Sequence, residues 1–218
     1  MIIGSQPWNE LAAVKQRLAD RGWFPGTSGN LAVRYDSDSL LVTTSGIDKY
    51  DTTDDSFVHV TNNGEPIDTS LRPSLETLLH LQIFEKTNAG CSLHVHTVNN
   101  NVISSVYKAH GNIRFKNQEL IKAFGLWEET DELVIPIIDN PADIPTLAAL
   151  FEPHIRGDKG AILIWNHGIN VWGKDAAQAF KLLEAAEFLF DYQLKLNQAN
   201  YYNRGVYLND NNKITAKW

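Results

Sequence analysis

The stretch Gly90-Cys91-Ser92-Leu93-His94-Val95-His96 decides how this chain folds and where its chemistry lies. It is short and largely apolar, and turn-forming residues flank it, so we predict a strand that ends at the second histidine. Because side chains two positions apart on a strand point to the same face, His94 and His96 are expected to lie side by side. Two imidazoles on one face can bind one metal ion.

A third histidine follows a similar run. Residues 161–165 are typical of a buried strand, and His167 comes two residues later in Trp165-Asn166-His167-Gly168. Three neutral nitrogens with no cysteine partner leave one tetrahedral position open, which is the arrangement of a catalytic rather than a structural zinc. Cys91 precedes His94 by an odd offset and should face the other way. The pattern therefore favours the metal site of an enzyme.

The alternative is that the His-x-His pair arose by chance. The chain has seven histidines, and a half-buried strand can carry histidines that face water. The other four histidines are isolated in the sequence, and a role in the core or on the surface is favoured for each of them: His59, His80, His110 and His154.

Composition narrows the classes of function. The 218 residues, 43% of them hydrophobic, can bury one substantial core, and we predict one domain over residues 1–218. The net charge of −7 and the scattered basic residues argue against nucleic-acid and membrane partners and favour a small metabolite. The amino terminus lacks a signal-peptide pattern and no apolar run could span a bilayer, so a cytoplasmic location is expected. The single cysteine, Cys91, is expected to be a small buried side chain.

Helical and strand-like patterns alternate along the chain. Apolar residues at helical spacing predict a helix over residues 9–21. Three strand-like runs then predict a small antiparallel meander, at residues 31–35, 40–44 and 57–61. Further helices are predicted at 73–85, 98–108, 144–154 and 175–197, and further strands at 133–137 and 161–165. One layered α/β domain is the economical interpretation, with a polar tail after Tyr201 that is either loosely ordered or packed on a neighbouring subunit.

Two turns combine glycines with hydroxyl side chains, Gly26-Thr27-Ser28-Gly29-Asn30 and Thr43-Thr44-Ser45-Gly46. Such turns can direct backbone N–H groups and hydroxyls at a phosphate, although a turn of this composition is more often only a turn. Ser74, directly after Pro73 at the predicted start of a helix, is a third candidate donor, and its alternative role is helix capping.

Two carboxylates are candidates for proton transfer beside the metal. Glu76 is predicted in the first turn of the helix that begins at Pro73, where the helix dipole alone would stabilise it. Glu119 lies three residues before Lys122 on a predicted short helix, and the spacing by itself favours a surface ion pair. A metal-bound hydroxyketone needs a proton acceptor, and this requirement makes both carboxylates candidates.

Together these motifs resemble the class II aldolase and adducin family. The elements of the match occur in the family's order and extend over most of the chain: Thr27-Ser28-Gly29-Asn30-Leu31-Ala32-Val33-Arg34, Thr44-Ser45-Gly46, Arg72-Pro73-Ser74-Leu75-Glu76, His94-Val95-His96 and His167-Gly168. The resemblance implies a three-layer α/β/α sandwich around a largely antiparallel or mixed central sheet. It also implies one zinc ion per subunit and a homotetramer with sites at subunit junctions.

The same resemblance implies roles for particular residues. Zinc is expected on His94, His96 and His167, and an acid/base carboxylate at Glu76. The expected phosphate contacts are Gly29, Asn30, Ser45, Gly46 and Ser74. Three histidines also accept iron, manganese or cobalt, so the identity of the metal stays open.

Residues 115–122, 134–140 and 168–173 are similar to segments of the family's dehydratases of methionine salvage. On this likeness Glu119 becomes the leading general acid/base. Leu75 and Asn99 stand where the family's aldolases carry a second serine and a further histidine. The implied function is zinc-dependent loss of water from a phosphorylated ketose that carries a methylthio group. The alternatives are aldol cleavage or epimerisation of another phosphorylated ketose, and a non-catalytic assembly module like adducin.

Overall fold

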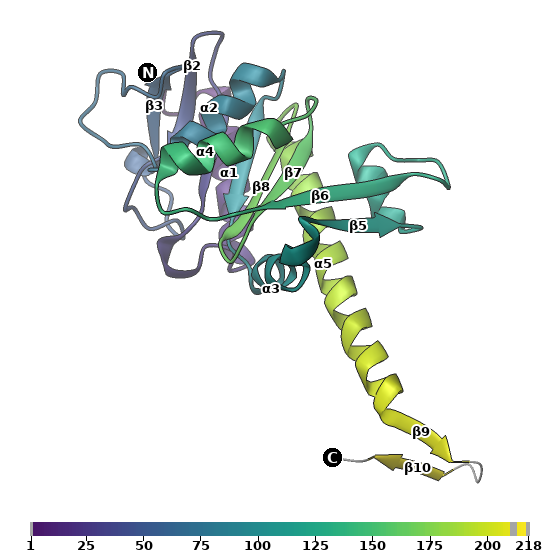
Figure 1. Ribbon diagram of the computed structural model, residues 1–218. Coiled ribbons are helices and arrows are strands. Elements are labelled where there is room, and N and C mark those ends of the chain that lie inside the picture. Colours follow the sequence, from purple (N-terminus) through teal and green to yellow (C-terminus); the bar gives the residue numbers. More distant parts are fainter. Residues whose placement is uncertain (1, 210–212, 217–218) are drawn as a thin grey trace.

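A mixed sheet of eight strands forms the middle of the molecule (Figure 1). The structure is a computed structural model and describes residues 2–209 and 213–216. The strand order is β3-β2-β1-β4-β8-β7-β6-β5. The strands are β1 (Asn30–Arg34), β2 (Ser39–Thr43), β3 (Phe57–Thr61), β4 (Cys91–Val95), β5 (Asn112–Lys116), β6 (Glu132–Ile138), β7 (Gly160–Ile164) and β8 (Gly168–Gly173). Neighbouring strands are antiparallel except β6 and β7, which run parallel.

Alternation along β4 divides the two faces of the sheet. Cys91, Leu93 and Val95 belong to one apolar core, whereas Ser92 contacts His80 on the opposite face. Since side chains alternate along a strand, His94 shares the face of Ser92. Cys91 therefore faces away from His94 and is fully buried, as the odd offset between them predicts.

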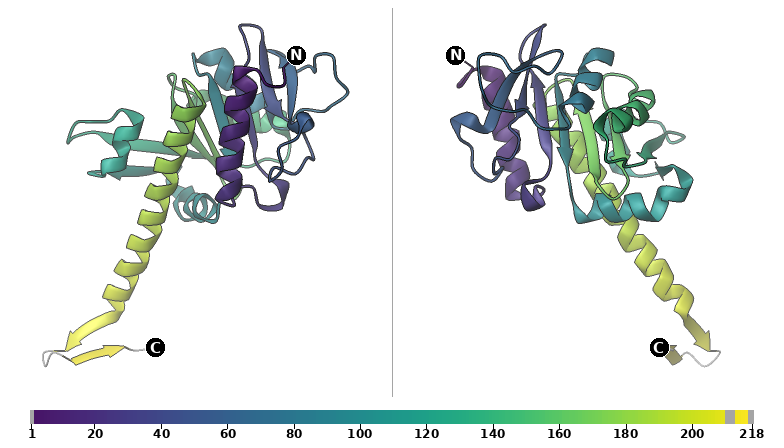
Figure 2. Two further views of the ribbon diagram at one scale, coloured as in Figure 1. Left: turned by 180° about the vertical axis from the view of Figure 1, so that it is seen from behind. Right: turned by 60° about the vertical axis from the view of Figure 1, so that its left-hand side comes forward.

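Helices cover both faces of this sheet (Figure 2). On one face, α1 (Gln6–Asp20), α3 (Val98–Tyr107) and α5 (Ala176–Gly205) bury apolar residues against the core that contains Leu93. On the other face, α2 (Thr77–Lys86) and α4 (Ile144–Phe151) pack on a second core that contains Ala32. The predicted three-layer α/β/α sandwich around a mixed sheet is confirmed.

Short 3₁₀ helices connect several of these elements: η1 (Pro25–Thr27), η2 (Asp54–Ser56), η3 (Lys108–His110), η4 (Glu119–Phe124) and η5 (Glu152–His154). The antiparallel meander β1-β2-β3 and the helix predicted over residues 9–21 are both confirmed. None of the helices in the described residues is long and apolar enough to cross a membrane.

The helix predicted from Pro73 begins later. α2 starts at Thr77, because Pro73 forms an isolated antiparallel bridge with Thr44 and the next residues form a turn. Ser74 therefore does not lie at a helix start, and Glu76 is the residue that precedes the first turn rather than a member of it. β4 ends at Val95, one residue before the end that the sequence predicts.

Two parts of the chain extend from the sandwich. β5, which the sequence pattern does not predict, pairs with residues 132–136 of β6, whereas only Ile137 and Ile138 pair with β7. The arm made by β5, η4 and β6 projects beyond the other strands (Figure 1). α5 also continues past the sheet to the hairpin of β9 (Val206–Asn209) and β10 (Lys213–Ala216). The expected polar tail after Tyr201 falls partly on residues 210–212, 217 and 218, which lie outside the described residues.

Candidate metal and active site

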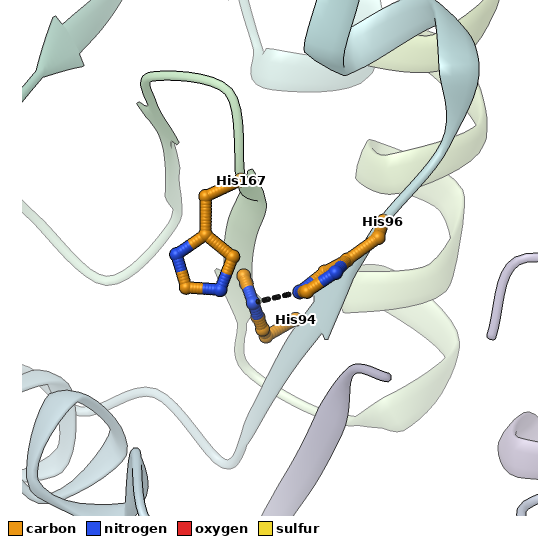
Figure 3. A group of neighbouring side chains, drawn as sticks. All are labelled: His94, His96 and His167. Atoms are coloured by element: carbon orange, nitrogen blue, oxygen red, sulfur yellow. Dashed lines mark hydrogen bonds between the residues drawn. The ribbon is translucent and has the colours of Figure 1, made fainter. Parts of the chain in front are cut away.

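Three histidines meet at the carboxyl end of β4. His94 lies on the strand, His96 follows its last residue, and His167 lies in the turn between β7 and β8. Their ligand nitrogens all lie within 4.8 Å of one another, and the three rings face a common point (Figure 3). Asn166 has a φ of 50° in this turn, a left-handed conformation that asparagine tolerates better than most residues. The structure thus brings together the three histidines that the sequence predicts.

Hydrogen bonds fix which nitrogen His94 and His167 direct to the cluster. His94 Nδ1 is 3.1 Å from the carbonyl oxygen of Ile169, and His167 Nδ1 is 3.2 Å from Asn140 Oδ1. Their Nε2 atoms therefore remain for the cluster, where His94 Nε2 lies 2.8 Å from His96 Nε2. Partners of this kind set the tautomer and the orientation of a metal-binding imidazole.

The protonation of the rings also suits a metal. Burial lowers the pKa of His94 to about 4 and the pKa of His96 to about 3. Both rings are therefore neutral at neutral pH, and a metal ion binding to them would displace no proton from either. The donor set of three imidazoles fits zinc or a similar divalent ion.

Gly168 allows the three rings to approach one another. A Cβ atom at this position would lie 2.5 Å from the carbonyl oxygen of Val95, 2.7 Å from His96 Cδ2 and 2.8 Å from His94 Cε1. Any larger residue would push the histidine rings apart. The glycine after His167 is thus part of the cluster's geometry.

Glu76 contacts the histidine cluster directly. Its Oε2 lies 3.3 Å from His94 Nε2, its Oε1 lies 3.0 Å from His167 Nε2, and Asn30 Nδ2 donates to Oε2 at 2.8 Å. Burial opposes ionisation, but His94, His167 and Asn30 outweigh it and hold the pKa of the Glu76 carboxyl well below its usual range. The cluster therefore carries an ionised carboxylate at neutral pH.

A buried chain of hydrogen bonds extends from Glu76 into the sheet. Asn30 Oδ1 lies 2.6 Å from His80 Nε2, and His80 Nδ1 lies 2.8 Å from Ser92 Oγ. His80 is fully buried, and burial lowers its pKa to about 4. The interpretation of His80 as a core residue is confirmed, but its link to Glu76 through Asn30 was missed. The four-residue spacing of Glu76 and His80, about one helical turn, was the signal for that link.

The turns expected to bind phosphate lie against one another. The backbone N–H of Ser45 donates to the carbonyl of Arg72 at 2.8 Å, and that of Ser74 donates to the carbonyl of Thr43 at 3.0 Å. These two N–H groups are thus engaged within the protein. Three other groups of these turns remain candidates to bind a phosphate: the hydroxyls of Ser45 and Ser74 and the N–H of Gly46.

Gly29 places the first turn beside the histidines. Its φ is +77°, and a Cβ atom there would lie 2.8 Å from the carbonyl oxygen of His94. The adjacent Asn30 pairs with His94 across β1 and β4, and its side chain is engaged by Glu76 and His80. Asn30 thus holds Glu76, a role that the sequence alone does not indicate.

Comparison with known proteins identifies the family. The domain described as the class II aldolase and adducin N-terminal domain matches residues 9–194. The chain belongs to this family. The ordered motifs around Gly29, Ser45, Ser74, His94 and His167 indicate the same relationship from the sequence.

Two curated relatives within the family are similar over nearly their whole length. The methylthioribulose-1-phosphate dehydratase of Bacillus subtilis (strain 168) is 58% identical over 200 residues, which are 90% of this chain and 96% of the relative. That of Geobacillus thermodenitrificans (strain NG80-2) is 57% identical over 198 residues, which are 89% of this chain and 94% of the relative.

Solved structures of the family share the fold. An L-fuculose 1-phosphate aldolase superposes with a TM-score of 0.73 at 22% identity and covers 89% of this chain and 88% of its own. YgbL of Escherichia coli, a putative aldolase/epimerase/decarboxylase, superposes with a TM-score of 0.74 at 19% identity and covers 96% of this chain and 92% of its own. At these identities the likeness concerns the fold alone.

Glu119 is not brought to the histidines within the described residues of one chain. It begins η4 on the projecting arm, its side chain is 79% exposed, and both of its carboxylate oxygens accept from Lys122 Nζ at 2.9 Å. The ion pair with Lys122 that the spacing predicts is present. The catalytic role of Glu119 stays a prediction.

Two further residues that support the site were not predicted from the sequence. Asn140 contacts His167 Nδ1, and Asn101 Nδ2 donates to the carbonyl oxygen of His167 at 3.0 Å. Both are asparagines in polar surroundings, and a single sequence holds no signal that would separate them from ordinary turn and helix-start residues.

Proposed function

We propose that this chain is a metal-dependent lyase that converts 5-methylthioribulose 1-phosphate to 2,3-diketo-5-methylthiopentyl 1-phosphate in methionine salvage. One observation carries the proposal. The histidine cluster with its ionised carboxylate lies in a chain that is 58% identical to a relative named methylthioribulose-1-phosphate dehydratase, over 96% of that relative's length.

The metal of the proposal is zinc, one ion per subunit. His94, His96 and His167 would hold it through their Nε2 atoms. Bound there, zinc supplies Lewis acidity that polarises the carbonyl at carbon 2 and makes the hydrogen on carbon 3 more acidic. The ionised Glu76 lies beside the Nε2 atoms of two of these histidines and, in this proposal, its negative charge favours a cation in the cluster and does not transfer protons.

The turns beside the cluster would orient the substrate. In the proposal, Gly29, Asn30, Ser45, Gly46 and Ser74 form the phosphate site, with the hydroxyls of the two serines as donors. Gly29 and Asn30 lie against His94, so a phosphate on carbon 1 held there sets carbons 2 and 3 beside the histidines. Positioning of this kind supplies a large part of the rate in enzymes that act on phosphorylated sugars.

Proton transfer is assigned to Glu119. Its carboxylate takes the proton from carbon 3 and delivers a proton to the oxygen on carbon 4, so that the enediolate expels this hydroxyl as water. The enol that remains takes up a proton at carbon 4 and loses the proton of its carbon 3 hydroxyl to give the 2,3-diketone. Aldol cleavage differs because the hydroxyl of carbon 4 must lose a proton, so the placement of one acid decides between the two reactions.

Glu119 is proposed to act on the cluster of a neighbouring chain within a homotetramer. The exposed apolar side chains near the site support such a junction. On α3, which follows His96 closely, Val98, Val102 and Val106 recur at every fourth position and are 78%, 39% and 53% exposed. Trp127 on the arm that carries Glu119 is 68% exposed. Contiguous apolar surface of this kind marks sites of protein contact.

Incubation of the purified protein with 5-methylthioribulose 1-phosphate tests the function. We expect the substrate mass to fall by one water, diketone absorbance to appear, and both to be lost on treatment with a chelator and recovered with added zinc. Carbon–carbon cleavage or a change in configuration without water loss would contradict the proposal in favour of an aldolase or an epimerase. A purified protein that binds no metal would favour a non-catalytic assembly module.

A further inference from the structure

Glu187 is a buried carboxylate on α5, and the histidine cluster does not contain it. Its residue is 5% exposed, and both carboxylate oxygens accept hydrogen bonds from the segment that follows His96. Thr97 Oγ1 donates to Oε2 at 2.8 Å, and Asn100 Nδ2 donates to Oε1 at 2.9 Å. A side chain of α5 thus binds the start of α3, immediately after the proposed metal ligand His96.

Thr97 and Asn100 in turn hold the backbone on both sides of His96. They form a reciprocal cap, in which Asn100 N donates to Thr97 Oγ1 at 3.0 Å and Thr97 N donates to Asn100 Oδ1 at 3.2 Å. Asn100 Nδ2 also donates to the carbonyl oxygen of Val95 at 3.3 Å. The residues before and after His96 are therefore fixed through the two side chains that Glu187 binds.

The same network reaches the third histidine. Asn101 Nδ2 donates to the carbonyl oxygen of Thr97 at 2.9 Å and to the carbonyl oxygen of His167 at 3.0 Å. The backbone at Thr97, next to His96, and the backbone at His167 are therefore tied together through one amide group. A displacement of Thr97 would be transmitted to both histidines.

Burying the Glu187 carboxylate in its ionised form costs folding free energy. Burial raises the pKa of Glu187 to about 7, and Asp191 on the same helix adds to the shift. Among the described residues, the ion pairs include no cationic partner for it. Capping of α3 alone does not require it, since Thr97 and Asn100 already cap each other. A buried group that costs stability, and that binds the two side chains that hold the backbone on both sides of His96, points to a role in the site.

We propose that Glu187 is a positioning residue of the metal site, which fixes His96, and through Asn101 His167, in the geometry that binds the ion. The inference rests on the proposed function, since it assumes that the three histidines hold a metal. Interactions behind the ligands commonly change metal affinity by about 10- to 100-fold when they are removed.

Metal affinity and metal spectroscopy test the proposal without recourse to turnover. The zinc dissociation constant is measured by competition with a chromogenic chelator, and the visible absorption of the cobalt-loaded protein reports ligand geometry. For Glu187→Ala we expect about 10- to 100-fold weaker zinc binding and a shifted cobalt band. Glu187→Gln, which keeps one acceptor for Asn100, should lose less. Thr97→Val removes the hydroxyl link and should change affinity in the same direction as Glu187→Ala.

Glu184→Gln is the matched control, because Glu184 lies three residues earlier on α5 and pairs with Arg21 at the surface. It should bind zinc as the unaltered protein does. A lower melting temperature for Glu187→Ala with an unchanged dissociation constant and cobalt spectrum would overturn the positioning role. If Glu187→Ala does not fold, an unchanged zinc dissociation constant and an unchanged cobalt spectrum in both Glu187→Gln and Thr97→Val would overturn the positioning role. An unaltered protein that takes up neither ion would instead overturn the proposed metal enzyme, and this inference with it.

Discussion

At the scale of single residues, the site depends as much on a missing side chain as on those present. The histidines supply the nitrogens, but Gly168 supplies the space in which their rings meet, since a methyl group there would overlap His94, His96 and the carbonyl of Val95. Contacts below about 3 Å between carbon and these atoms cannot be relieved without moving a ring or the backbone. The position next to His167 is therefore restricted to glycine.

Gly168→Ala should weaken zinc binding by at least about tenfold and lower dehydration in proportion, because one or more rings must turn away from the cluster. Chelator competition and the substrate assay measure the two effects. Gly160→Ala is the control, since its Cβ would meet the ring of Trp172 at 2.3 Å and so should cost stability without touching the histidines. Equal zinc affinity in the two variants would contradict this account.

At the scale of the element, the spacing of apolar residues predicts those helices and strands whose buried face follows a regular repeat. The helix over residues 9–21 was predicted because Leu11, Val14 and Leu18 recur at helical spacing, and all three are buried in α1. The alternation around His94 likewise predicted the strand and the side that each residue faces. Strand alternation and the apolar run that precedes His167 together indicated the three histidines that the structure brings together.

Other elements could not be predicted in this way. β5 pairs only with the end of β6 that projects beyond β7, so its strand character depends on that one partner. The start of α2 was misplaced because Pro73 is typical of a first helical turn, whereas here it bridges Thr44. The surroundings of Glu119 depend on the tertiary placement of the arm, which no local pattern encodes.

α5 carries a pH dependence of stability through Glu187. Its pKa is raised from 4.5 to about 7, so the folded protein holds the proton over a range in which the unfolded chain has released it. The contribution of Glu187 to the free energy of unfolding is therefore most favourable below about pH 4.5 and is lost as the pH rises toward 7. Measured by urea unfolding, the wild type should lose on the order of 2 kcal/mol more than Glu187→Gln between about pH 5 and about pH 8. Parallel pH profiles of the two proteins would refute the assignment.

At the scale of the whole molecule, the proposed site is divided between chains. The histidines and Glu76 lie at the end of β4, whereas Glu119 lies on a projecting arm and is exposed there. An arm that holds the proposed acid/base carboxylate outside its own sandwich is suited to complete the site of a neighbour in a closed ring.

Mixing two inactive variants tests this division. Glu119→Gln lacks the acid/base and His94→Ala lacks a metal ligand, so each should be inactive alone. If each site takes Glu119 from one chain and the histidines from the next, random reassembly of equal amounts should restore roughly a quarter of the junctions. Recovery is measured with the substrate assay after dissociation and reassociation. No recovery from well-formed mixed oligomers, or near-normal turnover by Glu119→Gln alone, would contradict the shared site.

The buried chain from Ser92 to Glu76 has a direction. Asn30 Oδ1 can only accept, so His80 must carry its proton on Nε2. The low pKa of His80 keeps the ring neutral, and its bare Nδ1 then accepts the hydroxyl proton of Ser92. Every bond in the series points its hydrogen toward Glu76, like dipoles aligned head to tail. Glu76 Oε2 accepts the last of these bonds, and the pKa of the Glu76 carboxyl lies well below its usual range, so we expect Glu76 to remain a fixed negative charge and to leave the movement of protons to Glu119.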